Sequence, residues 1–242
     1  MDAKIFIAVP SYQNPDVDFT ASYTGTVLNL YTGGMTAHPM FLHGNCYVHF
    51  CRDALAYHFL QTDCTHLFFW DNDVGAPVGA LRNLIQHDRD IVVAPYPKKI
   101  DPASDEAPWP IRLGDGIPNA RGLLKAETIA TGFLLIKRHV MEALWKKHYK
   151  DRAFLYEKMS KPGAPAIAVD LFPTGLVDIL PKAKIDHPDF PDGINMWWGE
   201  DVAFSLMARN AGFDIWLDPN IPLTHAGRYV WKGDFTKEAD KA

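Results

Sequence analysis

Short, almost continuous apolar runs alternate with segments of helical periodicity along this chain. The runs are KIFIAV (4–9), HLFFW (66–70), DIVVAPY (90–96), TIATGFLLIKR (128–138) and FDIWLD (213–218). Apolar residues at consecutive positions are typical of strands that are buried on both faces. Such strands, alternating with helices, predict an α/β domain whose mainly parallel central sheet is flanked by helices, a Rossmann-like arrangement.

Four helices are predicted between and after these runs, over residues 45–61, 77–86, 139–149 and 199–212. Their ends carry recognisable signals. Asn45 occupies an N-cap position, Pro77 lies in a first turn, and Gly212 ends the last helix. Residues 97–122 are rich in Pro, Gly and Asp and have no periodicity, so they are expected to form a long loop.

Size and charge restrict the class of protein. A chain of 242 residues that is 48% hydrophobic and 22% charged is typical of one globular domain, expected over residues 1–231 and followed by a charged tail at 232–242. The formal net charge of -5 gives no basic signature for binding nucleic acid. No run approaches the roughly 18 apolar residues of a transmembrane segment. The N-terminus, MDAKIFIAVP, does not resemble a signal peptide, so a cytoplasmic protein is expected.

The three cysteines do not form a metal-binding or disulfide pattern. Cys46, Cys51 and Cys64 are odd in number and lack a CxxC spacing. They are interpreted as buried free thiols in a reducing compartment.

Two carboxylates follow the second apolar run directly, in the stretch FFWDNDVG. Ligands of open α/β sheets bind beyond the carboxyl ends of the strands, which is where Asp71 and Asp73 are expected. A spacing of two residues places both side chains on one side, with backbones about 6–7 Å apart. A simple turn remains an alternative, but capping of the next helix does not explain them, because Pro77 places Ala76 at the cap. Hard oxygen ligands of this kind suit Mg²⁺ or Mn²⁺.

These segments also resemble a known family. The strand–DND–helix segment looks like the Asp-x-Asp motif of the GT-A-fold nucleotide-sugar glycosyltransferases, and further matches follow the family's inverting group. They are CRDAL (51–55) with the Arg-Asn pair, TIATGFLLIKR with the Thr-Gly-Phe strand, WWGEDVAF (197–204) with the Trp-Gly-Glu-Asp segment, and PLTHAG (222–227) with a late metal-binding His. The resemblance covers roughly residues 4–229.

Three departures from the family pattern are visible. Asp53 stands where the family has Asn, so only Arg52 carries over from that pair. The stretch MFLHGN (40–45) replaces the Asp-Asp-Gly-Ser segment that contacts the donor base in many members. Residues 97–122 match no family segment.

The resemblance implies a metal-dependent transferase that uses a UDP- or GDP-type sugar donor, with Mn²⁺ or Mg²⁺ as its cofactor. In that interpretation Asp73 binds the metal directly, and Asp71 contacts it through water or holds the donor ribose. His225 is implied as the third protein ligand; a histidine that merely lies in a buried loop is the alternative.

On the acceptor side the resemblance assigns Asp201 as the general base and Glu200 as a hydroxyl-binding residue. The alternative is that both acids only complement the dipole of a helix N-terminus. Trp198 and Gly199 precede the pair, and aromatic rings there suit either stacking on sugar or core packing.

Residues of the donor side follow from the same arrangement. Pro10, Ser11 and Tyr12 end the first strand, and Tyr12 is expected to stack on the donor base. Arg52 is expected to approach the donor or to orient Asp71, with a surface salt bridge as the simpler alternative. Thr131 and Gly132 are expected to let the substrate approach the backbone, unless the glycine marks a bulge. Lys98 and Lys99 are either phosphate ligands or a solvated pair.

Three functions therefore compete. An inverting glycosyltransferase with an unknown acceptor is the leading hypothesis, with retention of configuration as a variant of it. A nucleotidyltransferase acting on sugar phosphates is the second, although PSYQNPD (10–16) lacks the Gly-rich phosphate loop expected of it. A catalytically inactive domain that binds carbohydrate or nucleotide sugar is the third.

Overall fold

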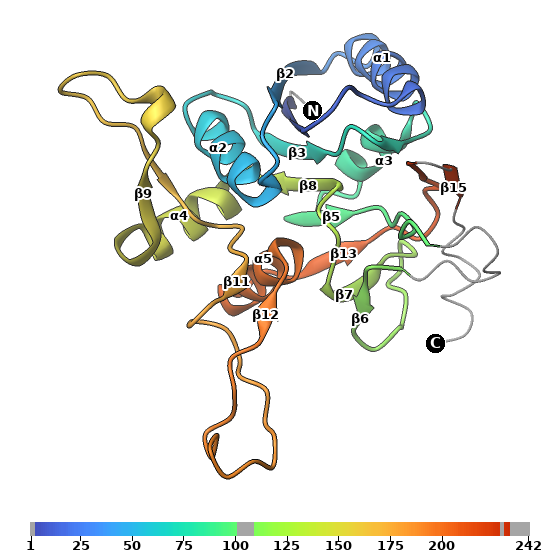
Figure 1. Cartoon of the computed structure of the whole chain (residues 1–242). Coiled ribbons are helices and arrows are strands. Elements are labelled where there is room, and N and C mark those ends of the chain that lie inside the picture. The colour runs from blue at the N-terminus through green and yellow to red at the C-terminus, as the bar shows by residue number, and fades with distance from the viewer. Residues whose placement is uncertain (1–2, 101–108, 228–229, 233–242) are drawn as a thin grey trace.

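A mixed eight-stranded sheet forms the centre of the molecule (Figure 1). The computed structural model describes residues 3–100, 109–227 and 230–232, the last of these as backbone. The strand order is β2-β1-β3-β8-β5-β13-β7-β6. In chain order these strands are β1 (Lys4–Ser11), β2 (Thr36–His43), β3 (His66–Trp70), β5 (Ile91–Val93), β6 (Arg112–Leu113), β7 (Leu124–Thr128), β8 (Phe133–Lys137) and β13 (Ile215–Leu217).

The strand directions confirm the α/β class and add a detail. β1 pairs in parallel with β2 and β3, and β5 pairs in parallel with β13. β8 lies between β3 and β5 and is antiparallel to both, and β7 is antiparallel to β13 and β6. The sheet is therefore mainly parallel in direction, with β8 and β7 reversed.

Helices cover both faces of the sheet (Figure 1). One face carries α1 (Val17–Thr32) and α3 (Ala80–Gln86), and the other carries α2 (Val48–Leu60), α4 (Arg138–Arg152) and α5 (Glu200–Asn210). Alternation along β1 shows why both faces are apolar. Ile5, Ile7 and Val9 pack in the core under α1 and α3, whereas Phe6 and Ala8 pack in the core under α2.

Some boundaries differ from the predicted ones. α1 and β2 lie outside the predicted segments. The predicted strand 128–138 contains the last residue of β7 and the whole of β8, with a break at residues 129–132. α2 begins at Val48, because the Asn45 side chain accepts a hydrogen bond from the amide of Tyr47 and forms a turn ahead of the helix instead of capping it. α3 begins at Ala80, after the turn that Pro77 starts.

The exposure of the cysteines agrees only in part with the prediction. Cys51 and Cys64 are buried as predicted, but Cys46 is exposed at the start of α2. The charged tail predicted from residue 232 lies, from residue 233 onward, outside the described residues. In the part of the chain that the structure describes, no helix has the length and apolar character needed to cross a bilayer.

Smaller strands extend the molecule beyond the sheet (Figure 1). β4 (Val74–Gly75), β14 (Thr224–Ala226) and β15 (Val230–Lys232) form a small sheet in the order β15-β14-β4. β9 (Ala153–Leu155) and β10 (Ile167–Val169) form an arm that includes the 3-10 turn η1 (Glu157–Met159). β11 (Gly175–Leu176) pairs with β12 (Trp197–Trp198), and the segment between them projects from the body.

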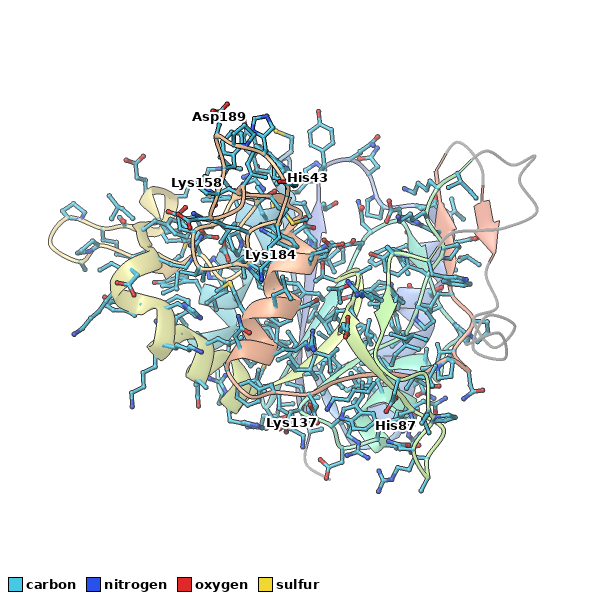
Figure 2. All side chains as sticks on the ribbon, turned by 90° about the horizontal axis from the view of Figure 1, so that it is seen from below. His43, His87, Lys137, Lys158, Lys184 and Asp189 are labelled. Atoms are coloured by element: carbon cyan, nitrogen blue, oxygen red, sulfur yellow. The ribbon has the colours of Figure 1, made fainter. Side chains whose placement is uncertain are left out.

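Both projections lie toward one edge of the sheet. Figure 2 shows His43, at the carboxyl end of β2, on the same side of the molecule as Lys158 of the arm and Lys184 of the projecting segment. Lys137, at the end of the reversed strand β8, lies at the opposite side. The carboxyl ends of β1, β2 and β3 therefore face the side on which the chain has added these segments.

Candidate active site

The loop after β3 is tied to the end of β1 and to the loop before β8. Asn72 donates through Nδ2 to the hydroxyl of Ser11 at 2.8 Å and to the carbonyl of Gln13 at 2.9 Å. The amide of Asp71 donates to the carbonyl of Gly132 at 2.9 Å. These contacts fix the backbone on which Asp71 and Asp73 stand, at the sheet edge where the sequence placed them.

Arg52 joins two of the predicted carboxylates. Its Nη2 lies 2.9 Å and 3.1 Å from the two carboxylate oxygens of Asp71, and its Nε lies 3.7 Å from Oε1 of Glu200. Burial raises the pKa of Asp71, even though the guanidinium of Arg52 acts in the opposite direction. Arg52 is buried, and its Nε and Nη1 have no hydrogen-bond partner among the described residues. Of the two roles predicted for Arg52, orienting Asp71 is the one that this geometry fits.

Asp73 faces two basic side chains. Its Oδ2 lies 2.5 Å from Nζ of Lys99 and 3.6 Å from Nε2 of His225. Burial by itself would raise the pKa of Asp73, but the contacts with His225 and Lys99 hold it below its ordinary value. Asp73 is therefore a carboxylate over the physiological range, and a cationic group already lies against it.

His225 reaches this position through strand pairing. β14 pairs antiparallel with β4, which places His225 opposite Val74, the neighbour of Asp73. The Nδ1 of His225 lies 2.7 Å from the carbonyl oxygen of Pro97. A carbonyl can only accept, so Nδ1 carries the proton, and in the neutral ring Nε2 keeps its lone pair on the side of Asp73. Metal-binding histidines are commonly held in this way.

A cavity of about 160 Å³ lies beside these groups. Its lining combines the end of β1, the lead-in to α2 and the loop after β3: Pro10, Ser11, Tyr12, Asn45, Cys46, Val48, Asp71, Asn72 and Asp73. The predicted donor residues and the aspartates thus share one opening. Tyr12 is 62% exposed, so its ring is accessible for stacking.

The acidic pair of the acceptor side opens α5. Gly199 is the N-cap, and Glu200 and Asp201 lie in the first turn. Asp201 accepts a hydrogen bond from the amide of Val202 at 2.7 Å, and a Cβ on Gly199 would lie 2.9 Å from the same oxygen. Burial, and next the charge of Glu200, raise the pKa of Asp201. A carboxylate with a raised pKa is a stronger base than an ordinary one.

Two of the predicted substrate contacts need correction. Thr131 is buried, with 1% of its surface exposed, so its side chain is not available to a substrate. A Cβ on Gly132 would lie 2.6 Å from Oδ2 of Asp71 and 2.6 Å from the hydroxyl of Tyr96. Gly132 therefore makes room for these two side chains, and not for the close approach of a substrate to the backbone.

The tryptophans before α5 divide between the two roles considered for them. Trp198 is partly buried and packs against the core beneath α2, α4 and α5. Trp197, its neighbour, is 75% exposed. Stacking on a sugar is therefore open to Trp197, whereas Trp198 is held by its packing against the core.

The site offers a divalent cation two side chains at close range. Across the described residues, no three His, Cys, Asp or Glu side chains form a group that could hold a metal by themselves. Asp71 is engaged by Arg52, which leaves Asp73 Oδ2 and His225 Nε2 as direct donors. One carboxylate and one oriented imidazole fit an ion that takes its other ligands from water and a diphosphate.

Tyr96 is a component of the site that the sequence reading did not include. Its hydroxyl accepts a hydrogen bond from the amide of Gly132 at 3.1 Å, and its ring packs edge-on against His225 at 4.9 Å. Tyr96 follows β5, so the rule that directed attention to the end of β3 would also have identified it.

No family model matches this chain. A curated relative, the mannan polymerase II complex anp1 subunit of Schizosaccharomyces pombe, is 27% identical over 162 residues. The match covers 65% of this chain but only 36% of that protein, so the chain spans about a third of its relative.

Two solved structures match this chain over most of its length. The crystal structure of A197 from STIV has a TM-score of 0.50 and 15% identity, covering 93% of this chain and 86% of that one. GalNAc-T7 with UDP, GalNAc and Mn²⁺ has a TM-score of 0.43 and 12% identity, covering 93% of this chain and 44% of that one. At 15% identity the similarity to the first structure concerns the fold alone, and the second has a TM-score below 0.5.

Proposed function

We propose that this chain is a GT-A-like glycosyltransferase that moves a sugar from a nucleoside-diphosphate donor to an acceptor hydroxyl, with inversion and with the help of Mn²⁺ or Mg²⁺. The curated relative supports a glycosyltransferase, because polymerising mannan means forming glycosidic bonds. Its name also places mannose-containing acceptors, such as mannobiose and mannotriose, first among the candidates.

One observation carries the proposal. Nε2 of His225 lies 3.6 Å from Oδ2 of Asp73, although the two residues are far apart in the sequence. The hydrogen bond from Nδ1 to Pro97 leaves Nε2 as the nitrogen that faces Asp73, and in the neutral ring this nitrogen can bind a cation. This arrangement supports a cation site at the edge of the cavity that Tyr12 and Asp71 line.

The chain's own residues then divide the work on the donor. Asp73 and His225 hold the cation, which when bound supplies Lewis-acid stabilisation to the leaving diphosphate. Tyr12 stacks on the base, and Ser11 shapes the floor beneath it. Arg52 holds Asp71 in place, and Asp71 accepts a donor hydroxyl or an ion-bound water.

Asp201 is the proposed base. It takes the proton of the acceptor hydroxyl while the new glycosidic bond forms and the nucleoside diphosphate leaves with the bonding electrons. Direct attack on the face opposite the leaving group inverts the anomeric centre. Glu200 would bind a substrate hydroxyl. It precedes Asp201 in the sequence, and its Oε1 lies 3.7 Å from Nε of Arg52.

A donor screen tests the proposal. Release of UDP, GDP or dTDP from sugar donors is measured with Mn²⁺ and with EDTA, with mannotriose as acceptor. We expect one nucleotide class to be released only with the metal, and Asp73→Ala to abolish that release. Asp214→Ala, which breaks an exposed ion pair with Lys125, is the matched control and should keep full activity.

Other results would support the competing functions. Binding of UDP or GDP without turnover, unaffected by EDTA, would indicate an inactive binding domain. Pyrophosphate release from a nucleoside triphosphate and a sugar phosphate would indicate a nucleotidyltransferase. NMR of the product anomer distinguishes inversion from retention.

A further inference from the structure

A second cavity, of about 470 Å³, lies next to the proposed active site. It is lined by the first turns of α2, the end of α4, the start of the β9–β10 arm and the segment after β10: His49, Phe50, Asp53, Asp151, Arg152, Ala153, Phe154, Asp170 and Thr174. Its volume falls within the range of small-molecule binding sites, about 300–1,000 Å³. None of the roles proposed above uses these residues.

The two cavities are neighbours across the first turn of α2. Val48 lines the donor cavity, and His49 and Phe50 line the second one. On its other side, the hydroxyl of Thr174 donates to the carbonyl of Trp198 at 3.0 Å. Trp198 ends the strand that leads into Glu200 and Asp201. The second cavity therefore borders the donor cavity and is joined, through Thr174, to the strand that leads into the proposed base.

The floor of this cavity is rigid. Oδ1 of Asp53 accepts hydrogen bonds from the amides of Leu171 and Phe172, at 2.8 Å and 3.1 Å. Arg152 forms an ion pair with Asp170 and also donates from Nε to its carbonyl at 3.0 Å. A preformed cavity binds its ligand without the entropic cost of ordering its own walls.

The wall chemistry selects among ligand classes. The rings of Phe50 and Phe154 lie 5.9 Å apart and provide an apolar surface. Polar groups of His49, Arg152 and three aspartates provide hydrogen-bond donors and acceptors beside it. Arg152 is already paired with Asp170, and Asp151 adds a further carboxylate, so a phosphate or nucleotide is disfavoured. An apolar face next to convergent hydrogen-bonding groups is what a neutral sugar ring requires.

We propose that this second cavity is an acceptor subsite that binds a neutral sugar unit of an oligosaccharide, next to the unit that receives the transferred sugar. The inference rests on the proposed glycosyltransferase function and adds to it the acceptor class. It also gives a role to the β9–β10 arm: the arm supplies Phe154, without which the cavity has one aromatic wall.

Binding measured without turnover tests this subsite. The dissociation constant of mannotriose is determined by saturation-transfer NMR, and that of UDP or GDP with Mn²⁺ by calorimetry, for the wild type, Phe154→Ala, His49→Ala and Leu155→Ala. His49 is a second, partly exposed wall residue, so its replacement leaves the core intact. Leu155 is the matched control, because it follows Phe154 on β9 and is 53% exposed.

We expect Phe154→Ala to weaken mannotriose binding about tenfold and His49→Ala about threefold, with Leu155→Ala unchanged and nucleotide binding equal in all four proteins. Equal mannotriose affinity in Phe154→Ala, His49→Ala and Leu155→Ala would overturn the subsite, and so would binding of spermidine in preference to mannotriose. Mannotriose binding that depends on Phe154, in a protein that binds no nucleotide, would support the subsite while refuting the proposed donor.

Discussion

Lys99 places an ammonium group where the proposed cation would bind. Its Nζ lies 2.5 Å from Oδ2 of Asp73, the same oxygen that His225 approaches. It is only two residues beyond Pro97, whose carbonyl orients His225. A divalent ion must therefore displace the ammonium from Asp73, and the released side chain is then free to pair with a donor phosphate. This makes Lys99 a competitor of the metal before the donor arrives.

Removing that competitor should strengthen metal binding in the absence of donor. A partly exposed ion pair contributes up to about 1 kcal/mol, so we expect Lys99→Ala to bind Mn²⁺ about two- to fivefold more tightly. This affinity is measured by titration, with free Mn²⁺ detected by electron paramagnetic resonance. Lys98→Ala is the control, because it removes the same charge from the adjacent exposed residue. Equal affinities in Lys98→Ala and Lys99→Ala would show that Lys99 does not compete.

Asp201 gives the reaction its expected pH dependence. Its carboxyl has a raised pKa, caused first by burial and then by Glu200. The base is active when ionised, so kcat should fall as the pH drops through this raised pKa, at a higher pH than for an ordinary aspartate. Glu200→Gln removes the neighbouring charge and should shift this acid limb to lower pH.

The same residue gives a test by substitution. Asp201→Asn should lower kcat by about 10²–10⁴-fold and leave nucleotide affinity unchanged, because the amide cannot accept the acceptor proton. Rapid-quench kinetics at saturating donor and calorimetry with UDP or GDP separate the two effects. Unchanged turnover in Asp201→Asn would remove Asp201 as the base.

At the level of single residues, the sequence predicted the positions of the site residues better than their contacts. Asp71, Asp73 and His225 were predicted to come together, and the structure places them at one sheet edge; their roles remain predictions. Gly132 was expected to serve the substrate, but it serves Asp71 and Tyr96, because a side chain there would collide with both. Such a collision depends on a contact between distant segments, which no local pattern reveals.

Among the elements, the pairing of β4 with β14 matters most for the site. Each strand is only two or three residues long, yet their register determines where His225 lies. Gly75 sits opposite Thr224 in that register. A Cβ on Gly75 would lie 2.4 Å from Oγ1 of Thr224 and 3.2 Å from Cβ of Asp18. The glycine is therefore required for the close approach of β14.

Gly75→Ala should displace β14 and carry His225 away from Asp73. We expect at least about a tenfold loss of Mn²⁺ affinity and a loss of about 1–3 kcal/mol in the free energy of unfolding. Adding Thr224→Ala to this variant removes the hydroxyl and should restore part of both. Gly79→Ala is the control, since nothing lies within 4 Å of its new methyl group. Normal metal affinity in Gly75→Ala would show that the register of β14 does not determine metal binding.

A helix or strand was easier to predict from the sequence when its pattern of apolar residues was stronger. β1, β3 and β5 are buried on both faces, and all three were found as apolar runs. β2 is mostly exposed and contains Pro39, and α1 buries only Phe19, Thr26 and Leu30. Neither element therefore gives a strong periodic signal in the sequence. The break between β7 and β8 was missed because the buried residues Ile129 and Ala130 continue the apolar run across it.

For the molecule as a whole, the site depends on segments from most of the chain. β1, α2, the loop after β3, the segment after β5, α5 and β14 each contribute one wall or one charged group. They belong to both helical layers and to the small sheet beyond them. A ligand that contacts several of these segments at once binds the folded state only, because unfolding separates them. Donor and metal together should therefore stabilise the whole fold.

Thermal unfolding measures that linkage. With the Mn²⁺ complex of UDP or GDP at about 100 times its dissociation constant, the folded state should gain about 2.7 kcal/mol, which for a domain of this size raises Tm by about 5–10 °C. Asp73→Ala and excess EDTA should each remove most of this increase, because the diphosphate then loses its link to Asp73 and His225. Asp214→Ala should retain it in full. A nucleotide-dependent increase of the same size in Asp73→Ala would mean that the nucleotide binds without the cation, and the proposed link between Asp73 and the donor would then be wrong.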